Sequence, residues 1–134
     1  MTTPRTVDTS IRVRYAETDA QGVVYHANYV VFFEVGRGAY LRAHGLNYGE
    51  FETAGHFIVV VEAHARYHAP ARYDDELVVR TWIKEVKTRS LTFEYEILKG
   101  ETTVASGWTA HVCVDRAGKP TQLPADLMKP LGLA

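Results

Sequence analysis

An almost entirely apolar stretch that begins at Asn28 constrains the fold of this chain more than any other feature of the sequence. In its first two turns the only charged residue is Glu34, so a helix there would have no polar stripe. We predict a helix from Asn28 to His44, with Asn28 as the N-cap and Gly45 as the C-cap. A helix that is apolar on nearly every side must be buried on most of them.

Two glycines inside this predicted helix, Gly36 and Gly38, indicate close packing. Each glycine costs about 1 kcal/mol relative to alanine in a helix interior. We expect a sheet or a second helix to approach the backbone closely at both positions, because such contact would offset the cost.

The rest of the chain is typical of strands, because apolar and polar residues alternate in short runs bounded by turn residues. We predict five strands, at residues 9–15, 57–68, 77–84, 91–97 and 108–114. The last three are joined by short links, which favours an antiparallel meander. The tail from Pro124 to Leu133 has room for one short helical turn. We therefore predict an α+β fold in which a curved five-stranded antiparallel sheet wraps one long helix.

Composition indicates one domain over residues 1–134, since 46% of the residues are apolar. The 15 basic and 16 acidic residues nearly cancel, which argues against broad nucleic-acid binding. The single cysteine, Cys113, excludes an internal disulfide, and its strand context indicates a small core residue. The first ten residues lack the apolar core of a signal peptide. The uncharged run Val23 to Phe33 is shorter than the roughly 20 residues of a transmembrane segment, so we expect a cytoplasmic protein.

The segment from Tyr15 to Tyr29 carries the clearest chemical signal, with Asp19, Gly22 and His26 placed ahead of the predicted helix. This order can bring a carboxylate close to the free N–H groups of a helix start. Such a pairing suits hydrolysis of an activated acyl group. Taken alone, however, Asp19 would more often be a turn or capping aspartate.

The same segment matches a family pattern. The pattern Y-x-x-T-D-x-x-G-x-V-x-x-x-x-Y is met by Tyr15, Thr18, Asp19, Gly22, Val24 and Tyr29. Further similarity lies in F-F-E-V-G-R from Phe32, in A-P-A-R-Y-D-D-E-L from Ala69 and in T-R-S from Thr88. Over roughly residues 9 to 125 the chain resembles hot-dog-fold acyl-CoA thioesterases. The resemblance is to the branch of 4-hydroxybenzoyl-CoA thioesterase, which includes bacterial acyl-CoA thioesterases linked to the Tol-Pal system.

The resemblance implies a hot-dog fold and a homodimer whose helices pack side by side, often assembled into a dimer of dimers. Active sites would lie at the dimer interface, with Asp19 as the catalytic carboxylate and His26 beside the N–H groups that receive the thioester oxygen. The residues expected to contact the acyl-CoA substrate are Gly22, Val24, Tyr25, Asn28, Tyr29, Phe33 and, near the CoA phosphates, Lys87, Thr88, Arg89 and Ser90. CoA is part of the substrate, so neither a separate cofactor nor a metal is expected.

The residues leave alternatives open. The Asp19 carboxylate can attack the thioester carbonyl itself or deprotonate a water molecule. The main alternative function is a hot-dog module that binds acyl-CoA without turnover. A dehydratase of the same fold is disfavoured, because the sequence lacks the histidine and carboxylate arrangement of those enzymes. A metal-dependent hydrolase would depend on His64 and His68, which share a strand face, but two histidines without a third ligand rarely bind a metal.

Overall fold

The computed structural model describes residues 6–131, so residues 1–5 and 132–134 of the predicted domain lie outside the described part. The elements in chain order are β1 (Val7–Arg12), the 3-10 turn η1 (Tyr15–Glu17), α1 (Asn28–Ala43), α2 (Tyr48–Thr53), β2 (Phe57–Tyr67), β3 (Glu76–Val86), β4 (Ser90–Lys99), β5 (Thr102–Val114) and α3 (Ala125–Met128). None of the described helices is long and apolar enough to cross a membrane.

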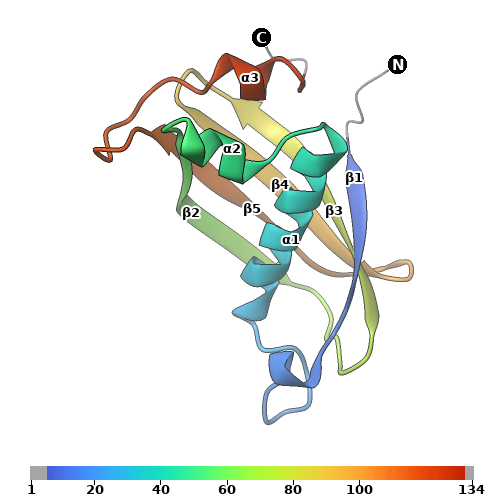
Figure 1. The fold of residues 1–134 in the computed structure, drawn as a ribbon. Coiled ribbons are helices and arrows are strands. Elements are labelled where there is room, and N and C mark those ends of the chain that lie inside the picture. Colours follow the sequence, from blue (N-terminus) through green and yellow to red (C-terminus); the bar gives the residue numbers. More distant parts are fainter. Residues whose placement is uncertain (1–5, 132–134) are drawn as a thin grey trace.

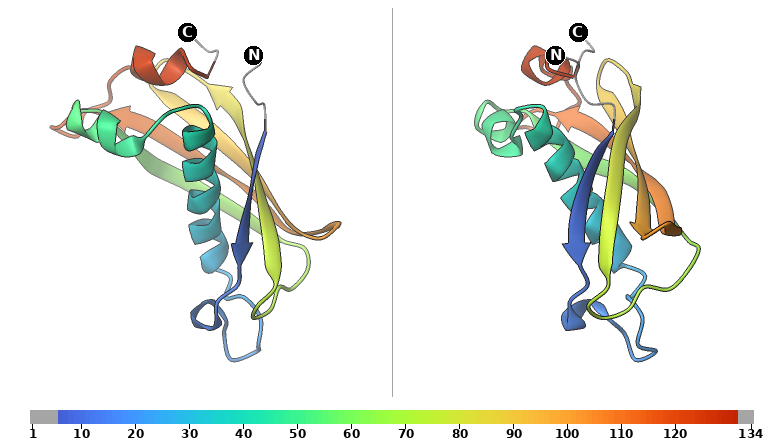
Figure 2. Two further views of the ribbon diagram at one scale, coloured as in Figure 1. Left: turned by 45° about the vertical axis from the view of Figure 1, so that its right-hand side comes forward. Right: turned by 90° about the vertical axis from the view of Figure 1, so that its right-hand side faces the viewer.

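The strands form one antiparallel sheet in the order β1-β3-β4-β5-β2, and α1 crosses one face of it (Figures 1 and 2). This confirms the predicted α+β architecture and the meander of the last three strands. The first strand is shorter than predicted, because the chain turns into η1 and leaves Tyr15 78% exposed. The short helix α2 was not predicted; it begins after Asn47, whose side chain caps it by accepting from Gly49 N at 2.7 Å.

Helix α1 is buried on one side only. The side chains that it buries against the sheet are Tyr29, Phe32, Phe33, Arg37, Tyr40 and Leu41, together with Gly36. Its opposite side leaves Val30, Val31 and Val35 exposed by 36%, 51% and 38%. The prediction of burial on most sides is therefore wrong for a single chain, and an apolar helix face remains uncovered.

The two helix glycines differ in what they contact. A side chain at Gly36 would overlap Thr81 Oγ1 and come within 2.7 Å of Val79 Cγ1, both on β3. At Gly38 the nearest group is the end of the Arg42 side chain, at 3.1 Å. The expectation of close sheet packing is confirmed at Gly36 and wrong at Gly38.

A chain of polar side chains lies inside the core, between α1 and the sheet. Arg37 Nη1 donates to the Tyr95 hydroxyl at 3.2 Å, that hydroxyl lies 2.5 Å from Thr109 Oγ1, and Thr109 Oγ1 lies 2.8 Å from His111 Nε2. All four residues are buried, as is Cys113, which confirms the prediction that this cysteine belongs to the core. Burial raises the pKa of Tyr95 to about 12. Burial and the nearby charge of Arg37 lower the pKa of His111 to about 3.

Candidate active site

Asp19 lies in a tight loop between η1 and α1. Thr18 and Val24 form an isolated β-bridge, and Gly22 N donates to Asp19 O at 2.9 Å with Gly22 at φ 81°. Asp19 Oδ1 accepts a hydrogen bond from Gln21 N at 2.9 Å, which is the geometry of an Asx turn. Asp19 therefore does have the turn role that is common for an aspartate in such a loop. Its second carboxylate oxygen has no hydrogen-bond partner within residues 6–131.

The Asp19 loop is attached to the start of α1. Glu17 O accepts from Tyr25 N at 2.9 Å and from Asn28 Nδ2 at 2.8 Å. Val24 N donates to Ala71 O at 2.8 Å, which ties the loop to the segment after β2. The prediction that Asn28 is the N-cap is wrong, because the N-cap is Ala27 and the Asn28 side chain instead holds the loop.

Just before α1, two backbone N–H groups have no acceptor within residues 6–131. Asn28 N donates to Tyr25 O at 2.9 Å and Tyr29 N donates to His26 O at 3.3 Å. The preceding N–H groups, those of His26 and Ala27, have no acceptor among the residues that the structure describes. Free N–H groups at the positive end of a helix can stabilise a developing negative charge.

A pocket of about 400 Å³ lies where this loop, the start of α1 and the end of β2 meet. Its lining residues are Asp19, Gln21, Val23, Val24, His26, Tyr29, Tyr67, His68, Ala69 and Pro70. Four residues predicted from the sequence, Asp19, Val24, His26 and Tyr29, are thus brought together. Burial raises the pKa of Tyr29, so its hydroxyl stays protonated and uncharged.

Other predicted site residues do not line this pocket. Phe33 is fully buried and stacks on Tyr95 with ring centroids 4.3 Å apart, so its predicted contact with substrate is corrected to a place in the core. Tyr25 is 46% exposed and packs on the His26 ring at 4.5 Å, while Gly22 forms the loop turn.

The predicted phosphate-binding hairpin lies far from Asp19 in the same chain. The turn between β3 and β4, with Lys87, Thr88, Arg89 and Ser90, lies beside α3, whereas the Asp19 loop lies at the other end of α1 (Figures 1 and 2). Leu123 N donates to Thr88 O at 3.0 Å, which fixes the hairpin to the C-terminal segment. One chain therefore does not bring these four residues to the Asp19 pocket.

Sequence reasoning did not assign Tyr67 and His68, at the end of β2, to this pocket. Tyr67 was read only as part of a strand, yet its hydroxyl donates to His26 O at 3.1 Å. His68 Nε2 lies 2.8 Å from Ser106 Oγ. His64, the other histidine of the metal alternative, does not line this pocket and stacks on Trp108 with ring centroids 5.6 Å apart. The similarity of the A-P-A-R-Y-D-D-E-L segment was the available signal, since it begins directly after His68.

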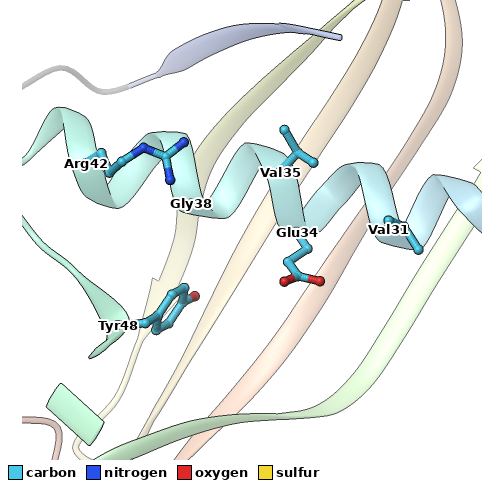
Figure 3. Close-up of a pocket in the computed structure, with 6 residues that line it drawn as sticks. All are labelled: Val31, Glu34, Val35, Gly38, Arg42 and Tyr48. Carbon is cyan, nitrogen blue, oxygen red and sulfur yellow. The ribbon is translucent and has the colours of Figure 1, made fainter. Parts of the chain in front are cut away.

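A second pocket, of about 420 Å³, lies on the uncovered side of α1 (Figure 3). Its lining residues are Val31, Glu34, Val35, Gly38, Arg42 and, from α2, Tyr48. Figure 3 shows the Glu34 carboxylate and the Tyr48 ring facing the space between α1 and α2. This pocket is continuous with the exposed valines of the helix rather than with Asp19.

Comparison with known proteins identifies the family of this chain. Residues 13–131 match the thioesterase-like superfamily. The acyl-CoA thioester hydrolase YbgC of Escherichia coli O6:H1 is 38% identical over 120 residues, which cover 88% of this chain and 90% of that protein. Among solved structures, hypothetical protein TT1821 from Thermus thermophilus superposes with a TM-score of 0.90 at 37% identity, covering 96% of this chain and 98% of that one.

A relative with a named substrate is the DHNA-CoA thioesterase from Staphylococcus aureus, with a TM-score of 0.85 at 32% identity. The match covers 88% of this chain and 80% of that one. The family match spans most of the chain, and these relatives share both its length and its fold. The chain therefore belongs to the thioesterase-like superfamily and is a thioester hydrolase with the hot-dog fold.

Proposed function

We propose that this protein hydrolyses acyl-CoA, with Asp19 as the catalytic carboxylate and the N–H groups of His26 and Ala27 as the oxyanion hole. The observation that carries the proposal is that Asp19 and His26 line one pocket at the start of α1, with Ala27 next to His26 in the chain. Within residues 6–131, one carboxylate oxygen of Asp19 accepts no hydrogen bond. The N–H groups of His26 and Ala27 have no acceptor among the same residues. The related acyl-CoA thioester hydrolase supports the choice of substrate class.

The chemistry needs few groups. Attack on the thioester carbonyl turns its oxygen into an oxyanion, and loss of one donor to such an oxyanion typically costs about 3 kcal/mol. The carbon–sulfur bond then breaks and CoA leaves as a thiolate, which needs little protonation. Asp19 either attacks the carbonyl and forms a mixed anhydride that water opens, or takes a proton from the attacking water. His26 borders the pocket, which supports a role for its ring in orienting that water.

Release of free thiol tests the proposal directly. Purified protein is given a panel of acyl-CoAs from acetyl to palmitoyl, with benzoyl-CoA and phenylacetyl-CoA added, and thiol is followed with a reactive dye. We expect Asp19→Asn to lower kcat by at least about 100-fold, because a positioned acid or base contributes that much or more. Asp74→Asn is the matched control, since Asp74 is exposed in the loop before β3 and, within residues 6–131, its carboxylate pairs only with Arg12.

The outcomes separate the proposal from its alternative. Near-normal turnover by Asp19→Asn would remove Asp19 from the chemistry. Wild-type protein that binds acyl-CoA but releases no thiol on any member of the panel would favour the binding module.

We also propose that the protein works as a homodimer. β2 is an edge strand, and its Val59, Val60 and Val61 are exposed by 38%, 48% and 55%. Pairing of β2 and α1 with a second copy would cover both these valines and the exposed face of the helix. The Lys87–Ser90 hairpin of one subunit would then contact the CoA phosphates at the active site of another subunit. The resemblance further implies a dimer of dimers.

A further inference from the structure

The hydroxyl of Tyr67 contacts the backbone at the start of α1. It donates to His26 O at 3.1 Å, across 41 positions of the chain. The contact joins the last residue of β2 to the residue that precedes Ala27, the N-cap of α1. Strand β2 is itself held along its length by pairing with β5, so the hydroxyl is carried by a rigid element.

The accepting carbonyl belongs to the peptide group whose N–H is that of Ala27. A carbonyl that accepts a hydrogen bond polarises its peptide group, so the N–H on the other side becomes a stronger donor. The same carbonyl also accepts a hydrogen bond from Tyr29 N, which is longer, at 3.3 Å. Tyr67 therefore acts on one of the two N–H groups that have no acceptor among the described residues.

Ring packing sets the position of this hydroxyl. The Tyr67 ring lies 5.4 Å from the Tyr29 ring and 6.2 Å from the His26 ring, between centroids. Its side chain also borders the Asp19 pocket, yet Tyr67 remains 48% exposed. A hydrogen bond this open to solvent adds little to folding stability, because water can replace it.

We propose that Tyr67 is a positioning residue for the oxyanion hole: it fixes and polarises the His26–Ala27 peptide so that the Ala27 N–H meets the thioester oxygen. This inference rests on the proposed function, in which that N–H receives the oxyanion. In this role the Tyr67 hydroxyl, with its proton donated to His26 O, acts through the peptide and not on the substrate.

Tyr67→Phe tests the inference, because it removes the hydroxyl and keeps the ring. We expect kcat for acyl-CoA hydrolysis to fall roughly 10-fold, less than the 100- to 1,000-fold loss of an entire donor. KM and the melting temperature are expected to change little. Tyr73→Phe is the matched control, since Tyr73 is 59% exposed and its hydroxyl bonds to no described residue. That control should keep wild-type kcat.

A second readout does not depend on turnover. The amide ¹H resonance of Ala27 should move upfield in Tyr67→Phe and stay in place in Tyr73→Phe, because a weaker donor is less deshielded. An unchanged Ala27 resonance together with unchanged kcat would overturn the inference. A raised KM with unchanged kcat would also overturn it, since Tyr67 would then contact substrate directly.

The two proposals can fail separately. If wild-type protein releases no thiol, the proposed function fails, and the catalytic role of Tyr67 falls with it. If wild type is active and Asp19→Asn is not, while Tyr67→Phe matches wild type in both readouts, only the inference about Tyr67 fails.

Discussion

At the scale of single residues, His111 makes the stability of the fold depend on pH. Burial and then the charge of Arg37 lower its pKa to about 3 in the folded protein, against about 6.5 when unfolded. Below pH 6.5 the unfolded chain therefore binds a proton that the folded chain does not. The stabilisation is fully present above that pH and is lost progressively as the pH falls toward 3.

We expect this group to lower the free energy of unfolding by about 2 kcal/mol between pH 7.5 and pH 5. Urea denaturation of wild type and His111→Gln at both pH values measures it, and the variant should lose less stability on acidification. His64→Gln, at an exposed histidine, should retain the wild-type dependence. Equal losses in wild type and His111→Gln would show that His111 is protonated in the folded state.

The residues of the site were predictable where they follow one another in the chain. Asp19, Val24 and His26 belong to one continuous motif, so their grouping is local. Tyr67 comes from a distant strand, and alternation along a strand does not tell which loop its end will meet. Phe33 was misplaced because a helix that is apolar on every side gives no signal of its rotation.

At the scale of elements, the contact between α1 and β3 depends on Gly36. Helix propensity alone predicts that Gly36→Ala gains about 1 kcal/mol. The new methyl group would overlap Thr81 Oγ1 and Val79 Cγ1, so we expect a net destabilisation of about 1–3 kcal/mol instead. Gly38→Ala meets only the flexible end of Arg42 and should be neutral or stabilising.

Urea denaturation of the two glycine variants, at the same protein concentration, provides the comparison. Equal stabilisation by both substitutions would mean that α1 can move away from the sheet without cost.

The strands themselves were predictable from the sequence because the alternation of apolar and polar residues is a local property. Helix α2 was not, since its six residues, Tyr48–Thr53, are too few to establish a helical period.

At the scale of the whole molecule, a single chain leaves apolar surface uncovered on α1 and on β2. We expect sedimentation to give at least twice the 15.0 kDa mass of one chain. Val60→Lys, which places a charge on the edge strand, should shift the protein toward that single-chain mass. Tyr73→Lys changes an exposed aromatic residue elsewhere and should leave the mass unchanged. Wild-type protein that sediments as one chain would contradict the proposed dimer.

Under the proposed function, Asp19 both accepts the hydrogen bond of the Asx turn and takes part in the chemistry, and this has a practical use. Asp19→Ala removes the acceptor for Gln21 N along with the charge, so the loop loosens together with the chemistry. Asp19→Asn keeps an amide oxygen for the turn and loses only the negative charge. Such a protein is suited as a bait, because it would capture acyl thioesters from a cell extract without consuming them. Mass spectrometry of what it retains would then name the natural acyl group.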